Sequence, residues 1–328
     1  MRAVRRKRAS IFSAAAPIEH IDLENLVVAL LAEHGSAWPN VLYRLGYRLH
    51  HFDAGITLLD PTSDPPGRPV QSRLDTVAHR ANTNTILAIE CKSGADAGLS
   101  QVPEGKAVPA EQWAEALALP RGSSRPPQTR GLLVAETDKL EPKLPDIERL
   151  GTSWLRADSG AFDVAPDNLG DNRIAPAVRA LPRTPWPRSY GPFSHDPTDG
   201  RERVVAAIAP LILSAAKRGD ASVSADDAAR LTHAAVWRVT DPGRQNSWAK
   251  IVATVLREMS EGSLRRMTRY DGSTRRLLLD GVRAGVPASV TTLTALRRGL
   301  AAEQRKSLAR SRRIKVTKPD QLALWPED

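Results

Sequence analysis

Two extended runs joined by a short polar turn, within residues 70–94, constrain the fold more than any other part of the chain. Val70–His79 has the composition of a strand, and Thr85–Cys91 is almost wholly apolar, which is typical of a strand covered on both faces. Ala81–Asn84 predicts a tight turn between them. If the two central turn residues are unpaired, the numbers of facing residues sum to 165. The sequence therefore predicts an antiparallel hairpin in a defined register.

This register places Asp75 opposite Glu90, with their Cβ atoms about 5 Å apart on one face of the sheet. The period of two along a strand puts Lys92 on the same face as Glu90. On a solvated face, such a group is a cross-strand ion pair worth under about 1 kcal/mol. We favour a metal site instead, because charges at the end of a buried strand are costly unless they are paired or bind a cation, and two facing carboxylates repel each other.

The spacing of Asp75, fourteen further residues and then Glu90–Lys92 resembles the motif of the PD-(D/E)xK, or restriction-endonuclease-like, nucleases. The resemblance covers about residues 19–135. It implies a Mg²⁺-dependent DNA endonuclease in which Mn²⁺ substitutes for Mg²⁺. Asp75, Glu90 and the main-chain carbonyl of Cys91 would bind the metal ion, and Lys92 would orient the attacking water.

The same resemblance implies two further site residues and has two departures. The family often supplies another acid from its first helix, which is Glu24 here, with Glu33 as the second candidate; an ordinary acid at a helix N-terminus explains Glu24 equally well. Some members place a glutamine on the helix after the Glu-x-Lys strand, here Gln112, but Ala116 replaces the aromatic residue that usually follows it. Leu74 stands where the family frequently has proline.

Residues 19–150 as a whole predict a mixed α/β sheet flanked by helices, as the resembled fold requires. Around the hairpin, the expected elements are a helix at Ile21–His34, a strand at Ala54–Leu59, a helix at Pro109–Leu119 and a strand at Gly131–Ala135. Residues 151–199 are rich in Pro, Gly, Asp and Arg, and they predict an extended linker between two domains.

Charge is distributed unevenly along a chain whose formal net charge is +10. Residues 200–328 contain 24 Lys and Arg against 13 Asp and Glu, whereas residues 1–199 contain 23 against 24. A basic half of this kind favours a polyanionic partner, and double-stranded DNA is the one we expect.

Residues 200–313 predict a mostly helical, basic DNA-binding domain. The expected helices are Arg201–Lys217, Ala225–Val239, Gln245–Met259 and Ala288–Arg313, and a hairpin turning at Asp271-Gly272 follows the third. Three helices followed by a hairpin resemble a winged helix; a helical bundle with an arginine-rich surface is an equal alternative. In the winged-helix interpretation, the third helix reads DNA through Arg244, Gln245, Asn246 and Lys250. The wing would use Arg265, Arg266, Arg269, Arg275 and Arg276.

The tail, residues 314–328, ends in a short peptide similar to the bacterial sliding-clamp-binding motif. Its anchors would be Gln321, Leu322, Leu324 and Trp325. Exposed Leu and Trp residues on a polar tail commonly bind a partner. The alternative is that the tail packs back on its own domain.

A single cysteine excludes a disulfide framework and fits a reducing cytoplasm. No apolar stretch is long enough to span a bilayer, so we expect no membrane association. We expect residues 1–18 to be a disordered basic arm that contacts phosphates rather than a signal peptide. A homodimer is also compatible with the sequence.

Several roles remain open at this point. The endonuclease would act in DNA restriction and phage defence or in DNA repair. Alternatively, the chain is a non-catalytic DNA-binding regulator, or an accessory subunit of a repair, transposition or defence complex. The sequence recognised in DNA depends on docking that the residue pattern does not define.

Overall fold

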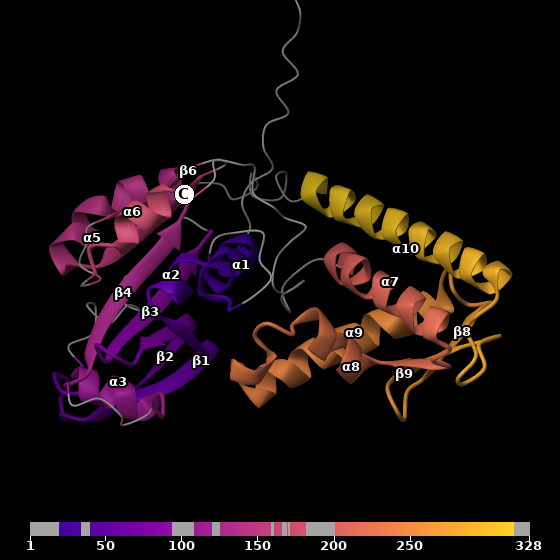
Figure 1. Cartoon of the computed structure of the whole chain (residues 1–328), viewed down its shortest axis with the longest axis horizontal. Helices are drawn as coiled ribbons and strands as arrows, with labels where there is room; N and C mark the ends of the chain where they lie inside the picture. The colour runs from indigo at the N-terminus through magenta and orange to yellow at the C-terminus, as the bar shows by residue number, and fades with distance from the viewer. Residues whose placement is uncertain are drawn as a thin grey trace, which may run out of the picture.

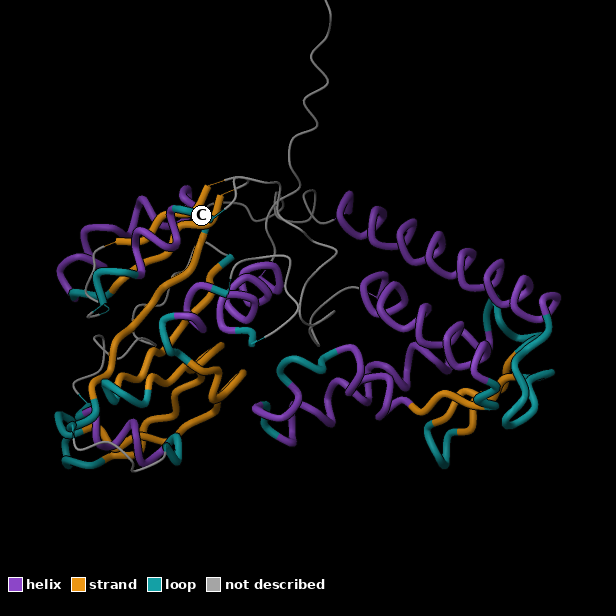
Figure 2. Tube along the Cα trace, viewed as in Figure 1, coloured by secondary structure: helices purple, strands orange, loops and turns teal. Residues whose placement is uncertain are grey.

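The structure, a computed structural model, describes residues 20–33, 40–93, 108–119, 125–158, 161–165, 169, 171–181 and 201–317. Figure 1 shows two parts: β1–β4 with α1, α2 and α3 in one, and α7–α10 with β8 and β9 in the other. The first part mixes strands and helices, and the second is mostly helical (Figure 2).

A six-stranded mixed sheet, in the order β1-β2-β3-β4-β5-β6, organises the first part. The first three strands are antiparallel, β4 and β5 run parallel to β3, and β6 is antiparallel to β5. Their bounds are β1 Arg48–Asp60, β2 Arg68–Arg80, β3 Thr85–Lys92, β4 Gln128–Ala135, β5 Ser153–Asp158 and β6 Ala161–Ala165. The expectation of a mixed sheet with flanking helices is confirmed.

The predicted hairpin register between β2 and β3 is also confirmed. Thr76 pairs with Ile89, and the pairs continue to Arg80 with Thr85, so facing numbers sum to 165. The turn closes with Asn84 N donating to Ala81 O at 3.2 Å. Asn84 has φ 51°, a left-handed conformation that asparagine tolerates better than most residues.

Helices cover both faces of β3, whose residues Thr85–Cys91 are all buried. Leu87, Ile89 and Cys91 belong to the core that contains α1 (His20–Leu31), whereas Ile86 and Ala88 pack with Trp113 of α3 (Ala110–Ala116). This two-sided burial explains the nearly continuous apolar run of the strand.

The remaining short helices of this part lie around the sheet. They are α2 Val41–Arg44, α4 Thr137–Leu140, the 3₁₀ turn η3 Glu141–Lys143, α5 Leu144–Leu150 and α6 Ile174–Arg179. The expectation that residues 151–199 form an extended linker is wrong for their first portion, because β5, β6 and α6 complete the sheet and its core. Leu155, Val164 and Val178 bury enough apolar surface to override the turn-rich composition.

The second part consists of helices and a small antiparallel sheet in the order β7-β9-β8. Its elements are α7 Arg201–Arg218, β7 Ser222–Ser224, α8 Ala225–Thr232, the 3₁₀ turn η4 Trp237–Val239, α9 Pro242–Glu261, β8 Thr268–Asp271, β9 Arg276–Leu279 and α10 Val290–Thr317. Ser224 caps α8, accepting from Asp227 N at 3.4 Å. The hairpin forms, but Asp271 pairs with Arg276, so four residues rather than two form its loop.

The two parts share a hydrophobic core. Ile21 and Phe52 pack in the cluster that contains Trp248 of α9 and Ile208 of α7. Phe52 also forms an isolated parallel bridge with Thr240. The first half of β1 is therefore held against the helical part by apolar contact and main-chain pairing.

Among the described residues, no helix combines the length and the apolar composition that crossing a membrane requires.

Candidate functional site

The middle of β2 and the C-terminal end of β3 bring together the three residues of the sequence motif. Asp75 is adjacent to Thr76, which pairs with Ile89 at the limit of the hairpin register, so it lies beside Glu90. Lys92 Nζ forms an ion pair with Glu90 Oε1, which places these two side chains on one face as the period of two predicts.

Main-chain hydrogen bonding holds Asp75 in place. Its Oδ2 accepts from the backbone N–H of Cys91 at 2.6 Å. The carboxylate thereby joins the middle of β2 to the end of β3, and a main-chain donor helps to fix its position. The Cys91 thiol is itself fully buried, and burial raises its pKa well above the ordinary value.

Helix α1 adds two more polar groups to this site. His20 Nε2 lies 3.3 Å from Glu24 Oε1 and 3.6 Å from Asp75 Oδ1. Sequence reasoning selected Glu24 but missed His20, because the expected helix began one residue later. The signal was present: His20 precedes Glu24 by four residues, which places both on one side of a helix.

Burial differs across the site. The side chains of Glu24 and Glu90 are 3% and 2% exposed, whereas those of His20, Asp75 and Lys92 are 37%, 17% and 20% exposed. Two carboxylates therefore lie at the floor and the other three groups reach solvent, so a ligand can approach from the solvent side.

Burial and neighbouring charges shift the pKa values of two groups strongly, those of Glu90 and His20. The pKa of Glu90 rises to about 7, because burial disfavours its charged form and the Asp75 carboxylate repels it, while Lys92 acts in the opposite direction. Burial alone would lower the pKa of His20, but the carboxylates of Asp75 and Glu24 outweigh that effect and raise it to about 10. Upward pKa shifts of this size are typical of functional sites and also of structural ion networks.

The carboxylates of this site suit a hard divalent cation. One ligand atom each of His20, Glu24 and Asp75 lie within 4.8 Å of one another, the one such group found among the described residues. Glu90 Oε2 is buried and has no hydrogen-bond partner in the same part of the chain. A buried carboxylate oxygen without a donor is costly, and a cation removes that cost.

Two other residues predicted for this site, Gln112 and Glu33, lie outside it. Gln112 Oε1 accepts from Leu59 N at 3.1 Å. Leu59 pairs with Pro69, near the opposite end of β2 from Asp75, so Gln112 supports the edge strand and the prediction of a site role is not met. Glu33 is exposed past the end of α1, where it interacts with Tyr43. Glu24 is therefore the acid that α1 contributes.

The predicted recognition residues at the start of α9 divide into two pairs. Arg244 forms an ion pair with Asp53, and Gln245 Nε2 donates to Trp237 O and Thr240 O at 2.6 and 3.0 Å. These two side chains are therefore engaged within the fold, contrary to the expectation of DNA contact. Asn246 and Lys250 are exposed and available for a ligand.

The predicted wing arginines are mostly exposed. Arg275 is the exception: it is partly buried and pairs with Asp226 at 2.7 Å. The exposed members are Arg265, Arg266, Arg269 and Arg276. They extend from the turn after α9 along both strands of the hairpin.

Two predicted segments lie outside the described residues. These are the basic arm, residues 1–18, and the peptide Gln321–Trp325 with its predicted clamp anchors. The comparisons also leave the question of function to geometry, since no protein-family model, curated protein or solved structure matches this chain.

Proposed function

We propose that this chain is a metal-dependent DNA endonuclease that hydrolyses phosphodiester bonds at the site formed by Asp75 of β2 and by Glu90 and Lys92 at the end of β3. The observation that supports this best is the state of Glu90. Its carboxylate is buried, Asp75 and Lys92 flank it, and its Oε2 has no hydrogen-bond partner among the described residues. Such a carboxylate is an apt ligand for a hard cation.

The order of elements supports the resemblance to PD-(D/E)xK nucleases. A helix, three antiparallel strands, a second helix and a strand parallel to β3 follow one another from α1 to β4, apart from the single turn of α2. The acids stand on β2 and β3 as that family's motif requires. In the second part, the order α7, β7, α8, α9, β8, β9, with β7 paired to β9, supports a winged helix.

Each residue has a role that its position allows. Asp75, Glu90 and the Cys91 carbonyl would hold the Mg²⁺ ion, with Glu24 and His20 beside them. When bound, such an ion polarises a phosphate and acidifies a water molecule. Lys92 presents an ammonium group next to Glu90, so it can donate hydrogen bonds to the attacking water. The same charge stabilises negative charge that develops on the phosphate.

The exposed basic residues of the second part would bind the flanking duplex through its phosphates. Asn246 and Lys250 of α9 and the exposed arginines of the hairpin are the candidates. Because each phosphate contact releases a counterion, affinity should fall steeply with salt. This binding needs no metal, so it can be measured separately from cleavage.

The test is nicking of supercoiled plasmid with Mg²⁺, with and without EDTA. We expect Asp75→Asn, Glu90→Gln and Lys92→Ala each to lower the rate by at least about 100-fold while duplex binding in EDTA stays unchanged. Glu115→Gln, an exposed acid on α3, is the matched control. Robust nicking by Lys92→Ala would refute the role given to that lysine.

A second outcome would replace the proposal. Duplex binding that is insensitive to EDTA, with no cleavage of any substrate, would indicate a non-catalytic regulator or an accessory subunit that acts with partners. The exposed arginines of the hairpin, which form no ion pair within the described residues, favour that candidate, since they support binding whether or not the site is active.

A further inference from the structure

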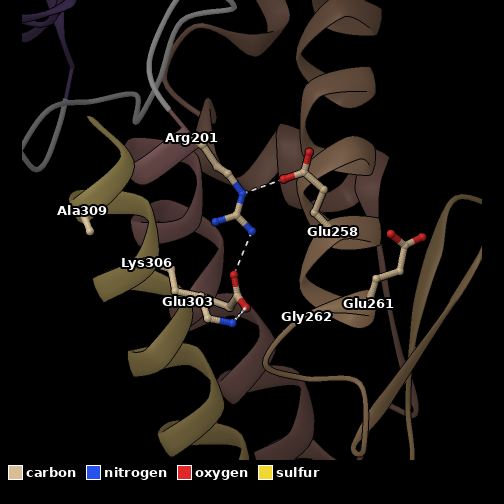
Figure 3. Close-up of a pocket in the computed structure, with 7 residues that line it drawn as sticks. All are labelled: Arg201, Glu258, Glu261, Gly262, Glu303, Lys306 and Ala309. Carbon is tan, nitrogen blue, oxygen red and sulfur yellow. Dashed lines mark hydrogen bonds and ion pairs between the residues drawn. The ribbon is translucent and has the colours of Figure 1, made fainter. Parts of the chain in front are cut away.

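Two neighbouring cavities lie where α7, α9 and α10 meet, and their charges differ. The first, of about 640 Å³, is lined by Arg201, Glu258, Glu261, Glu303 and Lys306, among others (Figure 3). Arg201 reaches Glu258 at 2.7 Å and Glu303 at 2.8 Å. These opposite charges neutralise one another, and the two ion pairs join α7 to α9 and to α10.

The second cavity, of about 810 Å³, lies between the α9–β8 turn and α10. Four cations and one carboxylate line it: Arg265, Arg266, Arg298, Lys306 and Glu261. Lys306 is already engaged, because it donates to Ser263 Oγ at 2.8 Å and lies 3.6 Å from Glu303. The available positive charge is therefore that of the three arginines.

The positive charge of these three arginines is not neutralised by an acid within the described residues. Arg265, Arg266 and Arg298 are exposed, and no carboxylate of the described chain lies within ion-pair distance of them. By contrast, Arg201, Arg218, Arg230 and Arg275 each pair with an acid. An excess of unneutralised cations in a concave site attracts a polyanion.

Close packing holds together the two backbone segments that carry these arginines. A Cβ added to Gly299 of α10 would lie 2.5 Å from Leu264 Cδ2 and 2.9 Å from Met267 Cε. Glu303 also accepts from Ser263 N at 2.7 Å. The turn that carries Arg265 and Arg266 is thus in direct contact with α10, and the groove is built on rigid elements.

We propose that Arg265, Arg266 and Arg298 form a groove that binds the phosphates of a nucleic acid backbone, with α10 as part of the DNA-binding surface. This rests on the proposed function, and it adds a helix to the surface expected from the hairpin alone. One guanidinium group can donate two parallel hydrogen bonds to the oxygens of one phosphate. Several neighbouring arginines therefore suit a phosphodiester chain. The lining offers Met267 and Ala295 as its apolar side chains, too little for anchoring a peptide.

Glu261 provides the sharpest diagnostic, because it is the one carboxylate that lines the groove among the described residues. An exposed carboxylate facing bound phosphates repels them. Glu261→Gln should therefore raise the affinity for duplex DNA. If Glu261 had only a structural role, its replacement would not raise this affinity.

The experiment measures duplex affinity by fluorescence anisotropy in EDTA over a range of salt concentrations. We expect Arg298→Gln and Arg265→Gln each to weaken binding about threefold to tenfold and to reduce the slope of log K against log salt by about 0.9. Glu261→Gln should tighten binding about twofold to threefold. Arg149→Gln, an exposed arginine paired with Asp146, is the control and should change neither quantity.

Competitors distinguish the sources of the anion. Duplex DNA should displace labelled duplex far better than inorganic phosphate, ATP or polyglutamate. Equal competition by polyglutamate would overturn the nucleic acid assignment in favour of an acidic protein, and unchanged affinity and slope in both arginine variants would overturn the groove itself. Because binding is measured without metal, a protein that binds through the groove but never nicks plasmid would refute the proposed activity and leave this inference standing.

Discussion

Arg244 Nε of α9 lies 2.8 Å from Asp53 Oδ2 of β1, an ion pair that joins the two parts of the molecule. The Asp53 carboxylate is 4% exposed and Arg244 is 17% exposed, whereas Arg73, the other partner of Asp53, is 59% exposed. Asp53 also has φ 54°, a conformation that costs energy in a residue with a side chain. The surrounding contacts must therefore hold it there.

We expect Arg244→Ala to destabilise the fold by about 2–4 kcal/mol, because it leaves a buried carboxylate with a single, solvent-exposed partner. Arg73→Ala should cost under about 1 kcal/mol, since that pair is largely solvated. Urea denaturation of the three proteins measures both values. Equal effects of the two substitutions would contradict the structural role given to Arg244.

Measurements of duplex binding can distinguish the exposed residue Lys250 of α9 from Gln245, which bonds within the fold. Lys250→Ala should weaken binding and lower its salt dependence, because Lys250 is exposed and can reach a phosphate. Gln245→Ala should leave affinity unchanged once the folded fraction is matched, since its amide bonds to Trp237 O and Thr240 O. Anisotropy titrations in EDTA compare them. A larger loss in Gln245→Ala would restore the original sequence-based assignment.

The choice between the two helix acids can be tested by activity. Glu24→Gln should reduce plasmid nicking strongly, because Glu24 lies with His20 and Asp75 at the site. Glu33→Gln should leave the rate within about twofold, since this acid is exposed and away from the cluster. Both proteins need circular dichroism as a check on folding. Loss of nicking in Glu33→Gln alone would reverse the assignment.

Stability should depend on pH through Glu90. The pKa of its carboxyl rises from 4.5 to about 7 on folding, so the folded protein holds this proton more tightly than the unfolded chain. The resulting stabilisation is complete below pH 4.5 and is lost as pH rises through about 7. In EDTA, the free energy of unfolding of wild type relative to Glu90→Gln should fall by roughly 2–3 kcal/mol across this window.

Metal addition provides the companion measurement. At the upper end of that pH window, Mg²⁺ should raise the unfolding midpoint of the wild-type protein, since a ligand that binds only the folded state stabilises it. The same addition should have little effect on Asp75→Asn. A difference between wild type and Glu90→Gln that is flat with pH, or an Mg²⁺ shift that survives in Asp75→Asn, would contradict the cation site.

The hairpin could be predicted from the sequence because two local signals agree. The apolar run of β3 demands cover on both faces, and a turn at Ala81–Asn84 leaves one register that keeps Glu90 at the strand end. Residues far apart in sequence were harder. Strands β5 and β6 were missed, because their burial depends on pairing with β4 and not on local composition.

Side-chain direction explains the remaining errors. Arg244 and Gln245 have the chemistry of DNA contacts, and only tertiary packing reveals that they face Asp53 and the η4 turn. His20 was missed for a different reason, since the expected helix began one residue later and left this histidine off the side of α1 that carries Glu24. Gln112 bonds to the edge strand because α3 lies along β1.

The link from Asp75 to the Cys91 amide limits what the aspartate can offer a metal. Oδ2 accepts from a main-chain donor and Oδ1 lies 3.6 Å from His20 Nε2, so the carboxylate has little freedom to change between monodentate and bidentate coordination. A metal site with so little conformational freedom would accept divalent ions close to Mg²⁺ in radius and discriminate against larger ones. Calcium, which prefers longer bonds and more ligands, should therefore bind there more weakly than Mg²⁺.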